Sequence, residues 1–192
     1  MPTPNPDALQ FLLTRRSRPA KTLAGPAPDR AALTELLTAA ARTPDHGKLE
    51  PWRFVVLERG ALARVAEAAI ARGRALDMDE DAIAKAAKSY ADSPLAVVVV
   101  AAPVPSPKIP RIEQLYSAGA VCLALLNAAL AAGWGANWLS GWASHDRAFV
   151  EGALGLSRDE QVAGIIHIGT ETATPPERPR PDMSAIVEWR DV

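Results

Sequence analysis

The sequence predicts an α+β fold in which helices enclose a sheet on both faces, forming a three-layer α/β/α sandwich within one domain of 192 residues. Three apolar runs have the length of strands and are separated by helical segments, at residues 54–57, 95–101 and 162–169. The run at 95–101 is continuous and rich in valine, which is typical of a strand buried on both faces. Such a sheet needs helices on each side.

The first part of the chain alternates helical segments with helix breakers. Residues 7–14 predict a short helix, and the prolines and glycine within 17–28 predict a loop. Asp29 is placed to cap a second helix, which extends to about Arg42 and is stopped by Pro44.

Four further helices are expected from the spacing of their apolar residues. They span residues 60–73, 79–91, 113–132 and 145–154. The short stretch at 136–142 fits either a strand or a loop. The proline-rich tail at about 171–192 cannot build a core of its own, and we expect it to reach across another surface, such as that of a partner subunit.

Composition and charge exclude several classes of function. The formal net charge is -1, so no basic footprint for nucleic acid is present. The single cysteine, Cys122, cannot form an intrachain disulfide, and the first residues do not resemble a signal peptide, so we expect a cytoplasmic protein. The apolar run at 118–134 is interrupted by Asn127 and Gly133, which favours a buried or interfacial helix over a membrane span.

Two arginines and a serine, Arg15, Arg16 and Ser17, follow the first predicted helix. The helix dipole alone favours a cation at this end by about 0.3–1 kcal/mol, which would explain one arginine. Two adjacent arginines point in different directions, and a guanidinium group can hold a phosphate through two parallel hydrogen bonds. The tripeptide is therefore a candidate anion site.

A second candidate lies in the loop that joins the second helix to the first strand. Arg42 and His46 flank Pro44, and Asp45 and Gly47 permit a tight turn that exposes backbone donors. His46 could equally be a loop histidine that caps a carbonyl group. With the arginine pair, these residues suit a phosphorylated, flat cofactor.

No motif predicts catalysis by side chains alone. The three histidines lack the spacing of metal ligands, so no metal site is predicted. Ser140 is not in a GxSxG turn, and no GxGxxG segment follows a strand, which argues against hydrolysis by a serine and against a dinucleotide-binding Rossmann site. We expect no catalytic residue and a cofactor that carries the chemistry.

In its order and spacing, the chain resembles the FMN-dependent nitroreductase superfamily, in particular its small, single-domain NAD(P)H nitroreductase branch. The resemblance covers nearly the whole chain. It rests on Arg15-Arg16-Ser17, on the segment Ala41-Arg42-Thr43-Pro44-Asp45-His46-Gly47-Lys48-Leu49-Glu50-Pro51-Trp52-Arg53-Phe54, on Ser117-Ala118-Gly119, on residues 133–141 and on Ile168-Gly169-Thr170.

The resemblance implies a domain-swapped homodimer with FMN bound between its subunits. Arg15, Arg16 and Ser17 would contact FMN from one subunit, and Arg42 and His46 from the other. Residues Asn137, Trp138 and Leu139 would line the other side of the flavin. The chain departs from many members at Lys48 and Glu50, where asparagine and glutamine are common, and Arg178 and Arg180 receive no role.

The resemblance also implies the reaction. NAD(P)H would reduce FMN in a ping-pong cycle, and a flat electron-poor acceptor such as a nitroaromatic or quinone would reoxidise it. The segment between Asp77 and Tyr90 is expected to cover the pocket. One alternative is another acceptor, with reduction of enones or aldehydes or dehalogenation of aromatic rings. A second is a non-catalytic flavin-binding dimer.

Overall fold

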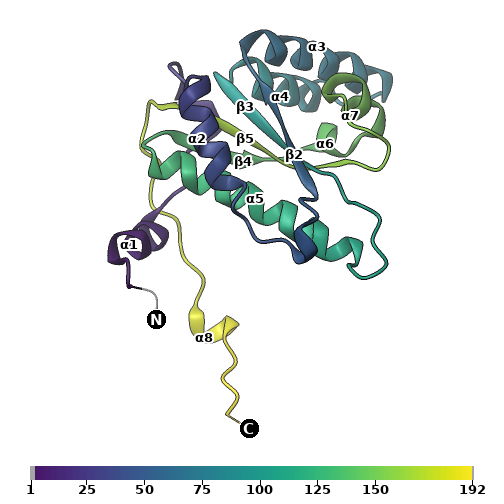
Figure 1. The fold of residues 1–192 in the computed structure, drawn as a ribbon. Coiled ribbons are helices and arrows are strands. Elements are labelled where there is room, and N and C mark those ends of the chain that lie inside the picture. The colour runs from purple at the N-terminus through teal and green to yellow at the C-terminus, as the bar shows by residue number, and fades with distance from the viewer. Residues whose placement is uncertain (1–2, 192) are drawn as a thin grey trace.

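The computed structural model describes residues 3–191 and confirms the α+β sandwich (Figure 1). The helices are α1 (Pro6–Thr14), α2 (Arg30–Ala40), α3 (Arg59–Ala75), α4 (Glu80–Ala91), α5 (Arg111–Ala131), α6 (Trp142–His145), α7 (Arg147–Leu154) and α8 (Met183–Ile186). The strands are β1 (Leu23–Ala24), β2 (Trp52–Leu57), β3 (Leu95–Ala101), β4 (Gly135–Leu139) and β5 (Gln161–Glu171).

Strand β5 is the centre of the sheet, because it pairs with β1, β3 and β4. Strand β3 also pairs with β2, and every pairing within residues 3–191 is antiparallel. Every residue of β3 is buried, as its valine run predicts. The ambiguous stretch at 136–142 is a strand up to Leu139, and the predicted loop at 17–28 contains β1.

The two faces of the sheet carry separate hydrophobic clusters, since neighbouring residues of a strand point to opposite sides. On one face Val98, Val100 and Ile165 pack against α3, α4, α6 and α7. On the other face Ile166 and Ile168 pack against α2 and α5. Figure 1 shows these helices as two layers with the sheet between them.

The helix predicted at 145–154 is present as α7 but begins two residues later, at Arg147. We predicted that His145 begins a helix, and this is wrong: His145 is the last residue of α6. Asp146 then adopts an extended backbone and caps α7, where its carboxylate accepts a hydrogen bond from Phe149 N at 2.8 Å. Arg72 of α3 holds the same carboxylate at 2.8 and 2.9 Å. The residues around Asp146 in the sequence do not predict this ion pair, because its partner is 74 positions away.

Helix α5 is long and apolar enough, by length and composition, to cross a membrane. It lies against the sheet, and its residues Val121, Cys122 and Leu125 are completely buried there. This packing is that of a core helix.

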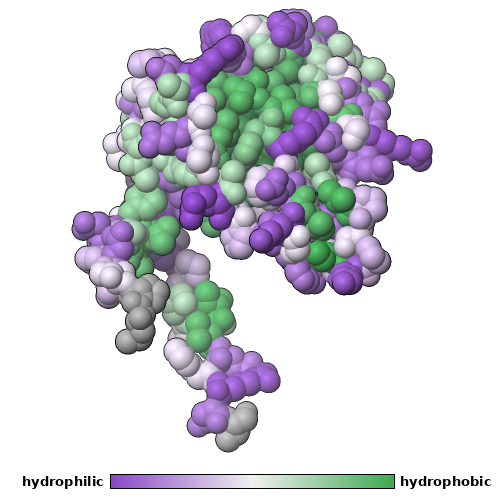
Figure 2. All heavy atoms as spheres, viewed as in Figure 1, coloured by the Kyte–Doolittle hydropathy of each residue, from purple (hydrophilic) through white to green (hydrophobic). Residues whose placement is uncertain are grey.

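Helix α1 and the C-terminal tail extend away from the body of the molecule (Figure 1). Their apolar side chains are exposed, among them Leu13 (65% exposed) on α1 and Trp189 (92%) on the tail. Figure 2 shows apolar side chains gathered on the projecting segment that carries α8. A contiguous apolar surface of this kind is typical of an interface.

Candidate functional site

The arginine pair lies where α1 ends. Arg15 is the C-cap residue of α1, and its backbone N–H donates a hydrogen bond to Phe11 O at 2.7 Å. Its Nη2 donates to Ser17 Oγ at 3.0 Å. Arg15 and Arg16 line a cavity of about 290 Å³, together with residues at the end of α5 and the start of β4, among them Leu130 and Gly135.

Two hydrogen bonds, one from the backbone and one from a side chain, hold the arginine segment against β4. Arg18 N donates to Ala136 O at 2.8 Å, and the Asn137 side-chain amide donates to Arg18 O at 2.8 Å. The structure therefore brings Arg15, Arg16 and Ser17 close to Asn137, although about 120 positions separate them. Asn137 thereby positions the arginine segment.

Positive charge in this cavity is not fully compensated. Arg15 Nε and Arg16 Nη1 are buried and have no hydrogen-bond partner within residues 3–191. Burial, followed by the nearby charges of Arg180 and Arg16, lowers the pKa of Arg15. Because buried charges need counter-charges, the arrangement favours an anionic ligand.

Arg180 is the residue of this group that sequence reasoning left without a role. The tail carries its positive charge into the neighbourhood of Arg15, while its Nη2 lies 2.9 Å from Glu177 Oε1. No pattern in the sequence near Arg180 predicts that it lies close to Arg15, because this depends on the path of the tail in the folded chain. The other unassigned tail arginine, Arg178, lines neither cavity described in this section.

Residues 137–139 divide between the two faces of the sheet. Asn137 and Leu139 lie opposite His167 and Ile165, on the side of α4. Trp138 lies on the other side, where its indole covers Gly164 of β5. Trp134, Trp138 and Trp142 do not form one helical stripe, because Trp138 lies in β4 and Trp142 begins α6.

Arg42 and His46 are not near the arginine cavity of the same chain. Both are exposed, and His46 Nδ1 lies 2.6 Å from Glu113 Oε2 in the first turn of α5. Ser117 Oγ anchors the same loop by donating to Pro44 O at 3.0 Å. The arginine cavity, by contrast, is at the opposite end of α5, beside Gly133. Twenty residues of helix separate these positions by about 30 Å.

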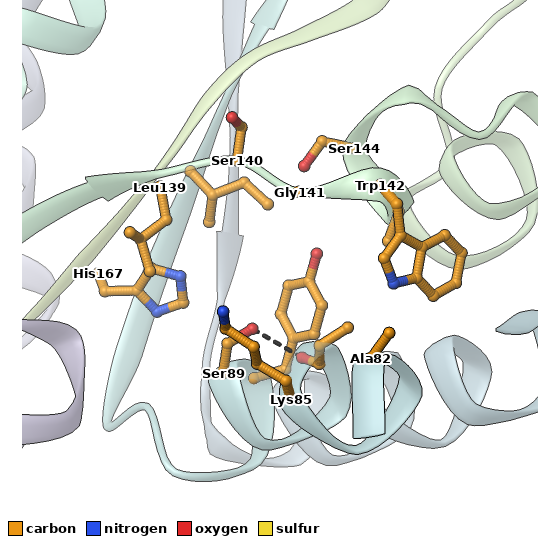
Figure 3. A pocket seen from close by; sticks show the side chains of 13 residues that line it. Ala82, Lys85, Ser89, Leu139, Ser140, Gly141, Trp142, Ser144 and His167 are labelled. Atoms are coloured by element: carbon orange, nitrogen blue, oxygen red, sulfur yellow. Dashed lines mark hydrogen bonds between the residues drawn. The ribbon is translucent and has the colours of Figure 1, made fainter. Parts of the chain in front are cut away.

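A second cavity, of about 440 Å³, opens between α4, β5 and the segment that joins β4 to α6 (Figure 3). Leu139 lines it, so it adjoins the residues predicted to line the flavin. Most of the lining is apolar. The segment expected to cover the pocket, 77–90, contributes helix α4, which supplies Lys85, Ser89 and Tyr90.

Several polar groups of this cavity were missed by sequence reasoning. His167 of β5 is buried and faces the cavity. Trp142 and Ser144 belong to the four-residue helix α6 and carry no motif. Burial raises the pKa of Tyr90 to about 12, against a weaker opposing contact with Ser144, so its phenol is neutral.

Known proteins resemble this chain in sequence and in fold. The model of the Nitroreductase family matches residues 12–170. YdjA of Escherichia coli, whose name carries a provisional assignment as an NAD(P)H nitroreductase, is 37% identical over 164 residues, which are 85% of this chain and 88% of the relative.

Two solved structures share the fold. A nitroreductase-like family protein from Bacillus cereus is 26% identical with a TM-score of 0.81, covering 100% of this chain and 99% of that one. NfnB from a Sphigopyxis strain, described as an FMN and NADPH-dependent nitroreductase, is 20% identical with a TM-score of 0.75, covering 96% and 99%.

Proposed function

Because the chain belongs to the nitroreductase family, we propose that it is an FMN-dependent NAD(P)H oxidoreductase. FMN, held by the residues described below, would supply the redox chemistry between NAD(P)H and a flat electron-poor acceptor, a nitroaromatic or a quinone, in a ping-pong cycle. The name of YdjA supports the reductant, and the description of NfnB supports the cofactor. The proposed location is the cytoplasm, which supplies NAD(P)H.

The observation that supports FMN as the cofactor is the pair of guanidinium nitrogens without a hydrogen-bond partner among residues 3–191, Arg15 Nε and Arg16 Nη1. FMN ends in a phosphate, which accepts charge-assisted hydrogen bonds and neutralises the crowded cations. The Ser17 hydroxyl lies 3.0 Å from Arg15 Nη2, where it can bind the ribityl chain or the phosphate. The guanidinium groups of this cavity therefore fit the FMN phosphate, and the carboxylate in the same lining, Glu171, is paired with Arg18 at 3.3 Å.

Bound FMN would supply the ring that accepts and releases hydride. The chain would hold that ring along β4, where Asn137, Trp138 and Leu139 follow the arginine segment in space. Asn137 ties the phosphate-binding segment to β4, so both ends of the cofactor site move as one unit. The cavity beside Leu139 is mostly apolar and would admit a flat acceptor.

The same proposal includes a homodimer. Arg42 and His46 lie about 30 Å from the arginine cavity along α5, so one chain cannot offer both sets to one cofactor. Two α5 helices packed antiparallel would place the first turn of one beside the last turn of the other. The exposed apolar residues Ile112, Tyr116 and Leu123 of α5 supply a surface for this contact.

Helix α1 and the tail support a domain-swapped form of that dimer. Leu9, Leu12 and Leu13 of α1 and Trp189 of the tail are more than half exposed. A tail that wraps a partner subunit would cover these side chains. It would also keep Arg180 close to the phosphate site.

The first experiment is the visible absorption spectrum of the purified protein, recorded in air and then anaerobically after NADPH is added. We expect a flavin spectrum that is bleached by NADPH or NADH. Bound FMN that neither nucleotide bleaches would instead indicate the non-catalytic flavin-binding dimer. A protein that stays colourless when FMN is supplied would refute the cofactor assignment.

Steady-state kinetics test the cycle. Double-reciprocal plots at several acceptor concentrations should give parallel lines, because NAD(P)+ leaves before the acceptor binds. Intersecting lines would show a ternary complex and refute the ping-pong scheme. A panel of nitroaromatics, quinones, enones and halogenated phenols then identifies the acceptor class.

A further inference from the structure

We propose that the 440 Å³ cavity beside Leu139 selects its acceptor by hydrogen bonds at two ends. It takes a nitroaromatic ring that carries a hydrogen-bond donor, a hydroxyl or an amine, opposite the nitro group. This inference rests on the proposed function, because it names the substrate subclass of that site. His167, Trp142 and Ser144 are the residues that make the selection.

The protonation of His167 follows from its neighbours. The Ser93 hydroxyl donates its proton to Leu95 O at 2.9 Å. Ser93 Oγ also lies 2.9 Å from His167 Nδ1, and since its own proton is already engaged, it must accept one from Nδ1–H. The proton of the neutral ring is therefore on Nδ1, and Nε2 carries a free lone pair.

The imidazole of His167 projects into the cavity from β5 (Figure 3). Its side chain is 1% exposed, and burial lowers its pKa to about 4, so the ring is neutral near pH 7. Within the described part of the chain Nε2 has no hydrogen-bond partner. An unpaired acceptor in the wall of a mostly apolar cavity favours a ligand that brings a donor.

The opposite side of the cavity presents donors. Trp142 Nε1 and Ser144 Oγ are buried; Trp142 Nε1 meets no hydrogen-bond partner among residues 3–191, whereas Ser144 is in contact with the Tyr90 phenol. Figure 3 shows Trp142 across the cavity from His167, with Ser144 above the space between them. The indole N–H can only donate, so it suits the oxygens of a nitro group.

The space between these polar ends is mostly apolar, although Lys85, Tyr90 and Ser140 also line the cavity, and it suits one ring. Ala82, Ala86 and Ile165 are among the residues that line it. A volume of about 440 Å³ is within the range of small-molecule sites, and a few convergent polar groups on an apolar lining typically fix the orientation of a ligand. A site built to pair with a donor rejects an analogue that lacks one.

The test compares 4-nitrobenzyl alcohol with 1-ethyl-4-nitrobenzene, which have nearly the same shape and differ by a hydroxyl in place of a methyl group. Each is titrated calorimetrically into the oxidised protein without reductant, so no turnover occurs. The measured quantity is the ratio of the two dissociation constants. Comparing this ratio between variants cancels the difference in hydrophobicity between the probes.

His167→Phe should shift this ratio against the alcohol by about five- to tenfold, the effect of one neutral hydrogen bond. Ser144→Ala should weaken both probes by a similar factor, because both carry the nitro group. Ser93→Ala keeps the imidazole but removes the group that holds its proton on Nδ1, so both tautomers become populated. The ratio of dissociation constants should therefore shift in the same direction as in His167→Phe, but by less. This variant serves if His167→Phe does not fold.

The matched control is Ser89→Ala. Ser89 lines the same cavity, but its hydroxyl is committed to Ala86 O at 2.7 Å (Figure 3), so the ratio should not change. An unchanged ratio in both His167→Phe and Ser93→Ala would overturn the inference. Loss of FMN from the His167 variant, with probe binding intact, would overturn it too, since the cavity would then hold the flavin.

The outcome can be separated from that of the proposed function. The titration can also be made on flavin-free protein, because the residues invoked here belong to one protomer. If the protein binds no FMN yet shows the predicted shift, the proposed function fails and the cavity assignment survives. If FMN is bleached by NADPH but the ratio does not move, only the selection by His167 is wrong.

Discussion

Replacing Gly164 with alanine should displace Trp138 and weaken FMN binding. A Cβ atom at Gly164 would lie 2.0 Å from Trp138 Nε1, 2.7 Å from Cδ1 and 2.8 Å from Cε2. Non-bonded heavy atoms prefer separations of about 3.5–4.0 Å, so the indole has to move by more than about 1 Å. Overpacking of this kind typically costs about 1–3 kcal/mol of unfolding free energy.

The expected consequences are measured by urea denaturation and by titration with FMN. The Gly164→Ala variant should lose about 1–3 kcal/mol of stability and bind FMN more weakly, since Trp138 is one of the proposed flavin residues. Gly152→Ala is the matched control. Gly152 lies inside α7, where a Cβ meets no atom of the described chain within 4 Å, so alanine should stabilise by about 0.5–1 kcal/mol.

The reasoning is refuted if Gly164→Ala has wild-type stability and wild-type FMN affinity. Such a result would mean that the indole has free space in which to turn. If stability falls while FMN affinity is unchanged, the packing argument holds, but Trp138 does not contact the flavin.

Three further predictions follow from the same structure. Arg16→Ala should weaken FMN binding by tenfold or more but leave riboflavin binding nearly unchanged, in fluorescence titrations, because about 1.5–3 kcal/mol of charged hydrogen bonding to the phosphate is lost. Leu123→Asp should yield a monomer without FMN by analytical ultracentrifugation; a dimer with bound FMN would refute the role of α5. Arg53, bonded to Glu160 at 2.6 and 2.8 Å, lowers the pKa of that carboxyl to about 2, against an ordinary value of 4.5. The free energy of unfolding should therefore fall by about 1–2 kcal/mol as the pH is lowered from 4.5 to about 2. This figure allows for the solvent that screens the charge of Arg53. In urea melts, Glu160→Gln should abolish this part of the pH dependence.

Much of the fold could be predicted because it is encoded in local patterns. The valine run of β3 implies burial on both faces, and it lies between helices that cover both. Asp29 and Asp79 cap α2 and α4 through bonds to backbone N–H groups three residues ahead, at 2.8 and 3.0 Å. Interactions over three or four residues leave a direct trace in the sequence.

The elements that were misjudged depend on distant partners. The two residues of β1 are a strand only because they pair with the end of β5, at Glu171 and Thr170. His145 ends a helix because Asp146 is held by Arg72 of α3. No window of neighbouring residues contains these contacts.

In the candidate site too, some features are encoded by neighbouring residues and others depend on residues that are distant in the sequence. The sequence alone identified the family pattern and the cationic tripeptide at Arg15, because residue types and their spacing are local properties. Only the tertiary structure decided that Arg180 joins that cluster, that Arg42 and His46 lie at the far end of α5, and that Ser93 holds the proton of His167 on Nδ1. These facts depend on where a folded chain brings side chains together, and both burial and hydrogen-bond direction are set by neighbours in space.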